Sequence, residues 1–255
     1  MVSWDHASVF TGGRLSEADI EKALTYPYWS PRASFLVNLD SQGYSELSDA
    51  EAAAYLAGRR PCLAIGSNAS PEQLLWKFTG HVQDPLLVVT PVHLHGFDVV
   101  YANRLSRYGA IPATLVECPG TAVAVKLIWC TDEQHQLLNA SESLGTGYHH
   151  EHVPVTAITA SKPVQSALQG QTSLDYYKAA AGPILVNQAP VALEAIRAEA
   201  RAWPAATEQE MLALLAELTN HSSIEAMLEV ATAEGGSWDK FNQQLQARPS
   251  HDKDL

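Results

Sequence analysis

The sequence predicts an α+β protein, and three observations indicate this class. Five runs that favour β-strands follow one another between residues 61 and 158, separated by Gly, Pro and polar turns. Helix starts with capping residues precede these runs and interrupt them once. From about residue 188, Ala, Leu and Glu recur at helical spacing. We therefore expect an N-terminal extension (1–60), a strand-rich domain (61–196) and a C-terminal helical region (197–255).

Each expected element has a local reason. Ser16 caps a first helix that runs to Leu24. The β-favouring runs are "PCLAI", "PLLVVTPVHLHGFDVVYA", "IPATLVEC", "TAVAVKLIWC" and "YHHEHVPVTAI". Further helices are expected after capping-box pairs, a Ser or Thr followed three residues later by Glu or Gln, at Ser48–Glu51, Thr131–Gln134 and Thr207–Glu210.

Composition and charge narrow the classes of partner. The chain of 255 residues has a formal net charge of −12, which disfavours a nucleic-acid or anionic membrane surface. No apolar run reaches the length of a membrane helix, and the first residues lack a signal-peptide pattern, so we expect a cytoplasmic protein. Cys62, Cys118 and Cys130 are far apart, which predicts buried free thiols. A small molecule is the expected partner, while the oligomeric state stays open.

The stretch "CLAIGSNASPEQLLWKF" places a polar loop between a strand and a helix start. Ser70 is a helix cap, Pro71 suits the first helical position, and Gln73 stands at the capping-box position. The free N–H groups of such a loop favour a carboxylate or a developing oxyanion, and Gly66 allows a ligand to approach the backbone. Taken alone, the loop is equally an ordinary strand-to-helix turn.

A second polar loop lies in "LLNASESLGTGYHHEHVPV". It holds one carboxylate, Glu142, and leads into a strand that begins at Tyr148. A single Glu in such a loop is usually solvated. The two loops together, however, resemble the γ-glutamyl cyclotransferase-like family, which carries a Tyr-Gly-Ser-Asn loop and a Leu-Asp-x-x-Glu-Gly loop before a Tyr-led strand. "HLHGFDVVYAN", "GAIPATLVECPG" and "AVAVKLIWC" resemble family segments in the same order.

The resemblance covers about residues 61–158, with three departures from the family pattern. Ile65 stands where the family has Tyr, Asn139 where it has Asp, and Ser143 where it has Gly. The resemblance implies a small β-barrel with flanking helices and a cavity bounded by both loops. The loss of the Tyr hydroxyl bears on the substrate more than on the fold.

The resemblance also implies an activity, the cleavage of a γ-glutamyl-type amide by intramolecular cyclisation. The substrate's own α-amine attacks its γ-carbonyl, which releases 5-oxoproline and an amine without a cofactor. By similarity, Glu142 is the catalytic base and acid. The residues implied to bind substrate are Ile65, Gly66, Ser67, Asn68 and Tyr148.

Two other functions remain open at this point. An amide hydrolase on the same scaffold would use Glu142 to activate water instead of a substrate amine. A non-catalytic small-molecule-binding module would keep the pocket without turnover; Ile65 favours that alternative and Glu142 disfavours it.

Histidine pairs raise the question of a metal site. His93 and His95, and likewise His150 and His152, each project from one face of a predicted strand. Their spacing matches no known metal-binding signature, so we interpret them as rim or surface residues and expect no metal.

Two further clusters are interpreted as structural. Asp5, His6 and Ser8 have the residue types of a catalytic triad, but such clusters at a chain start are usually surface residues. The aromatic run is expected to pack the N-terminal extension onto the strand-rich domain, and it would shape specificity if it covered the cavity; it comprises Tyr26, Tyr28, Trp29 and Phe35.

Overall fold

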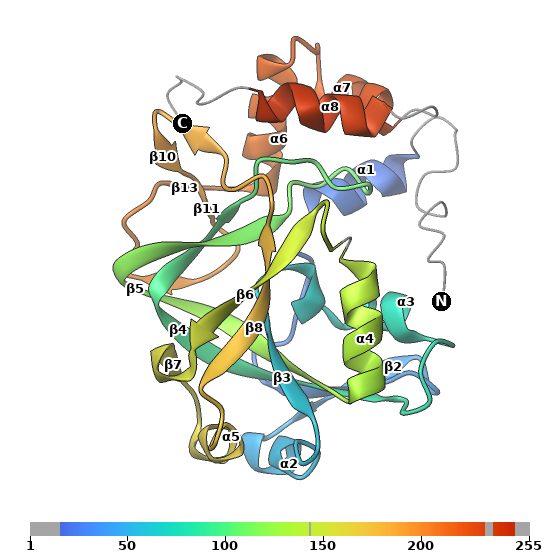
Figure 1. Cartoon of the computed structure of the whole chain (residues 1–255). Coiled ribbons are helices and arrows are strands. Elements are labelled where there is room, and N and C mark those ends of the chain that lie inside the picture. The colour runs from blue at the N-terminus through green and yellow to red at the C-terminus, as the bar shows by residue number, and fades with distance from the viewer. Residues whose placement is uncertain (1–15, 143, 233–236, 248–255) are drawn as a thin grey trace.

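The structure is a computed structural model that describes residues 16–142, 144–232 and 237–247. It is a mixed α+β protein, as the sequence predicts, with one large mixed sheet and helices packed at both ends and on one side of it (Figure 1). The helices are α1 (Glu17–Leu24), α2 (Asp49–Ala53), α3 (Pro71–Phe78), α4 (Asp132–Ser141), α5 (Lys162–Ala167), α6 (Glu208–Leu218), α7 (Ile224–Thr232) and α8 (Ser237–Gln246), with short 3₁₀ turns η2 (Ser67–Ala69) and η3 (Val155–Ala157).

The main path through the large sheet runs in the order β13-β11-β4-β5-β3-β8-β6. Most neighbours are antiparallel, while β3 with β8 and β11 with β13 are parallel. The pairings among the described residues do not close into a ring. The strands are β1 (Ser34–Asn38), β2 (Gly43–Leu47), β3 (Arg60–Ala64), β4 (Leu86–Tyr101), β5 (Ala113–Cys130), β6 (Tyr148–Pro154), β7 (Ile158–Thr159), β8 (Ser173–Ala179), β9 (Leu185–Val186), β10 (Ala189–Pro190), β11 (Ala192–Leu193), β12 (Ala198–Glu199) and β13 (Ala205–Ala206).

Two long strands, β4 and β5, form the centre of the sheet. Their pairing shifts register between His95 and Phe97, where Gly96 has a φ of +80° that suits a bulge. The runs "IPATLVEC" and "TAVAVKLIWC" belong to one continuous strand, β5, and not to two. Long bent strands of this kind let one sheet wrap around a core.

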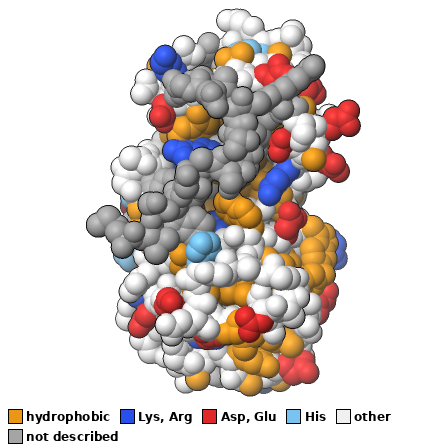
Figure 2. Space-filling view, turned by 90° about the vertical axis from the view of Figure 1, so that its right-hand side faces the viewer, with side chains coloured by type: hydrophobic (Ala, Val, Ile, Leu, Met, Phe, Trp, Pro, Cys, Tyr) orange, Lys and Arg blue, Asp and Glu red, His pale blue; other side chains and the backbone are white. Residues whose placement is uncertain are grey.

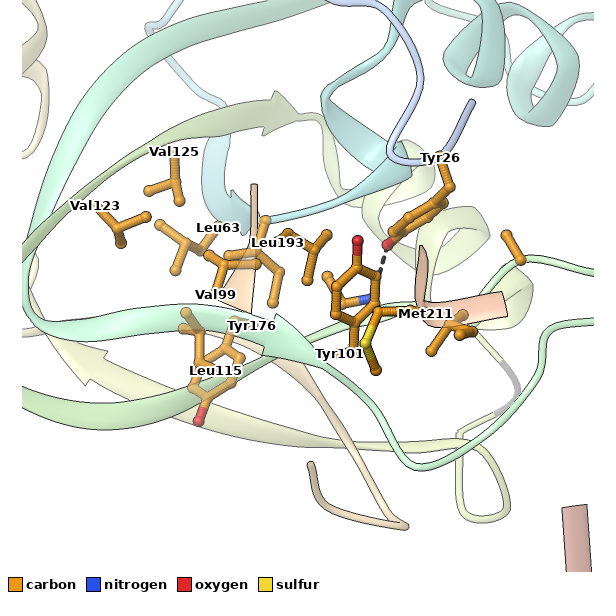
Figure 3. Close-up of a cluster of buried hydrophobic side chains, with 14 of the residues drawn as sticks. Tyr26, Leu63, Val99, Tyr101, Leu115, Val123, Val125, Tyr176, Leu193 and Met211 are labelled. Carbon is orange, nitrogen blue, oxygen red and sulfur yellow. Dashed lines mark hydrogen bonds between the residues drawn. The ribbon is translucent and has the colours of Figure 1, made fainter. Parts of the chain in front are cut away.

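The main core lies inside the curve of the sheet and is closed by the C-terminal helices. Figure 3 shows apolar side chains from β3, β4 and β5 facing one another, among them Leu63, Val99 and Leu115. Met211 of α6 joins them and is fully buried. Burial of this apolar surface is the main driving force for the fold.

The N-terminal extension contributes to the same sheet. Its strand β1 pairs antiparallel with both β2 and β4. Phe35 is fully buried in the core, whereas Trp29 is 62% exposed and its ring lies 5.6 Å from that of Tyr44. The aromatic run thus packs the extension onto the sheet through some of its members only.

One part of the C-terminal expectation is wrong. The helical pattern predicted from about residue 188 begins only at Glu208, because residues 188–206 form the short strands β10 to β13. Two of these strands pair with the long central strands, Ala192 with Val100 and Ala198 with Val123. Tertiary pairing outweighs the helix propensity of Ala and Glu here. The sequence also predicts a break near the end of the helical region at the Gly235-Gly236 pair, which lies outside the described residues.

Helix capping follows the sequence at most predicted starts. Capping boxes form at the N-termini of α2, α4 and α6, and Ser16 caps α1. The helix α3 begins at Pro71 as expected, but Ser70 makes no side-chain cap hydrogen bond. The predicted Ser70–Gln73 capping box is therefore wrong, and Gln73 lines a cavity instead.

Charged side chains lie on the surface, and the predicted buried free thiols are confirmed. Figure 2 shows acidic side chains scattered over one face among apolar and polar ones. Cys62, Cys118 and Cys130 are buried and free. In the described part of the chain, no helix combines the length and apolarity needed to cross a membrane.

Candidate functional site

Both predicted loops line one cavity of about 120 Å³ at one end of the sheet. The expectation that they share a cavity is therefore confirmed, although more than 70 residues separate them in sequence. The small volume suits a small ligand or one end of a larger one. The predicted residues that line it are Ile65, Gly66, Ser67, Asn68, Glu142 and Tyr148.

Glu142 is held through one of its two carboxylate oxygens. Its Oε1 accepts hydrogen bonds from Lys77 Nζ at 2.6 Å and from Asn68 Nδ2 at 3.0 Å. Lys77 Nζ also donates to Asn68 Oδ1 at 2.7 Å, which closes a triangle of three side chains. The second carboxylate oxygen, Oε2, has no hydrogen-bond partner among the described residues. The contacts of the described residues thus fix the carboxylate through Oε1 alone.

The same contacts set the protonation state of Glu142. Burial of this side chain opposes ionisation, but the Lys77 ammonium and the hydrogen bonds outweigh that effect and hold the pKa of Glu142 below its ordinary value. Lys77 and Glu142 are only 9% and 12% exposed, so solvent screens this pair weakly. Glu142 is therefore an anion at neutral pH.

Gly66 is required by a protein contact. A side chain at this position would overlap the hydroxyl of Tyr26. The Tyr26 hydroxyl accepts a hydrogen bond from the Ala113 N–H at 2.8 Å, drawn dashed in Figure 3. The N-terminal extension thus brings a phenol into the cavity beside Ile65, the position that lacks a hydroxyl of its own.

Arg104 also lines the cavity and lies in the segment that joins β4 to β5. It is 8% exposed, and its guanidinium carbon lies 5.1 Å from the ring centroid of Tyr148 and 5.5 Å from that of Trp238. A side chain at residue 147 would overlap the guanidinium, so Gly147 makes room for it. Arg104 Nη1 is buried without a hydrogen-bond partner in the described structure.

Asn139, the position at which the family has Asp, lies behind the cavity. Its Oδ1 accepts hydrogen bonds from Tyr177 Oη at 2.7 Å and from His150 Nε2 at 3.1 Å. Its Nδ2 lies 3.3 Å from Nδ1 of His135, whose pKa is lowered by burial and by Arg60. Since Tyr177 lines the cavity, Asn139 positions one of its walls.

The histidine pairs do not gather into a metal centre. His93 and His95 are exposed on β4, His152 Nδ1 lies 2.9 Å from Asp175, and His150 contacts Asn139. No group of three or more His, Cys, Asp or Glu side chains is arranged to hold a metal within the described ranges. Asp5, His6 and Ser8 lie outside those ranges.

A larger hollow of about 1310 Å³ lies on the other side of Tyr26 and Ile65. It contains Lys126, whose pKa burial lowers to about 8. Glu142 does not line this hollow. The two sequence motifs therefore point to the smaller cavity.

Sequence reasoning missed several residues of the cavity. Lys77 could have been predicted as a cavity residue. It stands about one helical turn after Gln73, so both side chains lie on the same face of α3, the helix that directly follows the loop. Tyr26, Arg104 and Trp238 reach the cavity through contacts between distant segments, for which no local pattern exists.

Comparison with known proteins adds little. No family model matches the sequence, and neither does any curated protein sequence. Two solved structures are similar in part. One is an Arabidopsis thaliana protein solved in solution, with 16% identity, coverage of 48% of this chain and 70% of that one, and a TM-score of 0.33. The other is a crystal structure of an uncharacterised Homo sapiens protein, with 15% identity, coverage of 78% and 92%, and a TM-score of 0.35.

Proposed function

We propose that this protein cleaves γ-glutamyl-type amides by intramolecular cyclisation, on a sheet of the γ-glutamyl cyclotransferase-like barrel type. The observation that carries the proposal is the carboxylate of Glu142, anchored through Oε1 in the same cavity as the loop of Gly66, Ser67 and Asn68. Its Oε2 has no hydrogen-bond partner among the described residues. A reaction whose nucleophile comes from the substrate needs a positioned base and no Ser or Cys nucleophile.

The reaction balances without water. The substrate's α-ammonium gives a proton to Glu142 Oε2, and the free amine then attacks the γ-carbonyl carbon. A carbon–nitrogen bond forms to the α-nitrogen, which then loses a second proton, and the bond to the leaving nitrogen breaks. Glu142 passes both protons in turn to the leaving nitrogen, so the amine departs as an ammonium ion. The products are 5-oxoproline and an amine. Holding the amine near the carbonyl lowers the activation barrier by roughly several kcal/mol, as in other well-aligned intramolecular reactions.

The remaining roles follow from the walls of the cavity. The loop of residues 66–68 binds a glutamyl carboxylate or the developing oxyanion, and the ring of Tyr148 lines the site. Lys77 keeps Glu142 ionised at neutral pH, so that the carboxylate can receive a proton.

A specific observation favours a second candidate, a small-molecule-binding module without turnover. The lowered pKa of Glu142 makes it a weaker base, and a general base works best with a pKa near the operating pH. Ile65, which stands where the family has Tyr, also favours a module without turnover. An amide hydrolase in which Glu142 activates water uses the same geometry and differs in its product.

One assay separates these functions. The protein is incubated with a panel of γ-glutamyl amides and peptides, and 5-oxoproline and free glutamate are quantified. We expect 5-oxoproline and an equal amount of amine. Free glutamate supports the hydrolase, and binding without product supports the module.

A further inference from the structure

The cavity holds more positive charge than its one carboxylate balances. Among the described residues that line it, the charged ones are Lys77, Arg104, Arg107 and Glu142. Lys77 forms an ion pair with Glu142. The two arginines form no ion pair with any described residue, although the whole protein carries a net charge of −12.

Arg104 is buried with unused hydrogen-bonding capacity. An arginine remains charged in proteins and carries five donor hydrogens in a planar fork. The side chain of Arg104 makes no hydrogen bond to a described residue, and its buried Nη1 is left without an acceptor. The rings of Tyr148 and Trp238 compensate part of the charge through cation–π contacts, but rings accept no directed hydrogen bonds of ordinary strength.

Hydrogen bonds from α8 fix the chain next to Arg104. Asn242 of α8 bonds to both the N–H and the C=O of Leu105, at 2.7 and 3.1 Å. Trp238 lies near both arginines, 5.3 Å from the guanidinium carbon of Arg107, and its own buried Nε1 has no acceptor in the described structure. Unsatisfied donors on neighbouring side chains thus gather at one wall of the cavity.

We propose that Arg104, with Arg107 at the rim, forms an anion subsite that binds a carboxylate of the ligand while Glu142 binds its ammonium group. A carboxylate matches the fork of a guanidinium through two parallel hydrogen bonds. The cavity then recognises an amino-acid-like ligand through two lining groups of opposite charge. The choice of γ-glutamyl ligands below rests on the proposed function; the subsite itself does not.

In a γ-glutamyl compound this carboxylate has two possible sources. One is the α-carboxylate of the glutamyl unit, and the other is a carboxylate on the leaving amine. Three ligands separate them: γ-glutamyl-glycine has both groups, γ-glutamyl-methylamide has only the first, and the α-carboxamide of γ-glutamyl-glycine has only the second.

Binding is measured by calorimetry in the Glu142→Gln background, with and without Arg104→Gln. Loss of a charge-assisted bidentate contact is expected to weaken binding about 10- to 100-fold. If the leaving-group carboxylate occupies the subsite, Arg104→Gln weakens the binding of γ-glutamyl-glycine and of the α-carboxamide and leaves the binding of the methylamide unchanged. If the α-carboxylate occupies it, the binding of γ-glutamyl-glycine and of the methylamide weakens, and that of the α-carboxamide is unchanged.

Arg104→Lys, which keeps the positive charge without the planar guanidinium, should weaken binding by an intermediate factor. Arg32→Gln, at an exposed arginine outside this cavity, is the matched control and should change nothing. Should Arg104→Gln not fold, the three ligands are compared in the background alone, where the ligand without the bound carboxylate should bind about 10- to 100-fold more weakly.

The proposal is overturned if the three ligands bind equally well, if the parent protein neither binds nor cleaves any of them, or if Arg104→Gln weakens the binding of all three to the same extent. Its failure is distinguishable from failure of the proposed function. A parent protein that makes no 5-oxoproline but shows this ligand pattern keeps the subsite and loses the activity. The reverse result keeps the activity and loses the subsite.

Discussion

Glu142 and Glu208 are both withdrawn from solvent, yet their surroundings shift their pKa values in opposite directions. Glu142 faces an ammonium group, and its pKa is lowered despite burial. Glu208, 3% exposed at the start of α6, accepts one hydrogen bond from the Ile111 N–H at 2.6 Å and forms no ion pair with a described residue, so burial raises its pKa well above the ordinary value. Burial alone therefore does not identify a base; the partner decides which carboxylate is ionised.

The two carboxylates also differ in what their second oxygen meets. Oε2 of Glu208 is buried without a hydrogen-bond partner among the described residues, whereas Glu142 lines the cavity. Glu208 holds the segment that carries Arg104, through Ile111, and Glu142 is placed to meet a ligand. The contrast separates a structural acid from a candidate catalytic one.

The largest expected effect is on turnover in Glu142→Gln. This change keeps shape and hydrogen bonding but removes the basic oxygen, so γ-glutamyl amide cleavage should fall by about 100- to 10,000-fold. Steady-state kinetics measures it, and Glu208→Gln is the matched control. Equal rates in the Glu142→Gln variant and the parent would place the base elsewhere.

The second prediction concerns the cation that distinguishes the two sites. Lys77→Met leaves Glu142 buried without a counter-charge, so the free energy of unfolding should fall by about 3 to 5 kcal/mol. Because only the hydrogen bonds from Asn68 and Ser141 then oppose the effect of burial, the pKa of Glu142 should rise, and the acidic limb of the pH–rate profile should move to higher pH. Urea unfolding and pH–rate curves test both effects.

Two further variants control this prediction. Lys162→Met, at an exposed lysine on α5, should change neither quantity. In a double-mutant cycle, Lys77→Met with Glu142→Gln should cost less than the sum of the single changes, since the buried charge is gone. Full additivity would mean that the 2.6 Å pair contributes nothing.

A smaller effect should distinguish the carboxylates by pH. The raised pKa of Glu208 gives stability that is complete below its unfolded pKa, about 4.3, and is lost as pH rises toward the folded pKa. Glu208→Gln should therefore gain stability relative to the parent above that pH, by at most about 1.4 kcal/mol per pH unit. The lowered pKa of Glu142 works oppositely, because its contribution is lost as pH falls through the folded pKa.

Unfolding free energies between pH 4 and 8 measure this contrast. Glu21→Gln on α1 is a control, and its difference from the parent should stay flat. A Glu208→Gln difference that also stays flat would show that Glu208 is ionised like an ordinary surface carboxylate.

No change is expected from metal removal. Attack by an internal amine needs no metal-activated water, so activity should survive a chelator. Stoichiometric zinc in the purified protein, together with loss of activity in His150→Ala, would instead support a metal-dependent hydrolase.

The sequence predicts local features well and distant contacts poorly. The capping boxes of α2, α4 and α6 form because Ser48, Thr131 and Thr207 each act on a residue three positions away. At Ser70 the same pattern forms no capping box, and the side chain of Gln73 lines the cavity instead. The Ala-rich stretch before Glu208 pairs as strands because β4 and β5 offer partners that a helical pattern does not reveal.

The candidate site shows the same division. Glu142 and the loop of residues 66–68 come from family-like motifs, and the fold brings them within hydrogen-bond distance. Lys77 and Arg104 set the charge of the cavity but belong to no such motif. They depend on how α3 and the segment between β4 and β5 pack, which a single sequence does not specify.

The most direct test of the account is cleavage of γ-glutamyl-glycine in water enriched in oxygen-18, with the products analysed by mass spectrometry. If the substrate amine is the nucleophile, as we propose for Glu142 acting as proton shuttle, 5-oxoproline and glycine appear in equal amounts, and neither carries the label. Glutamate carrying one oxygen-18 atom would mean that water attacks the carbonyl, and it would contradict the account.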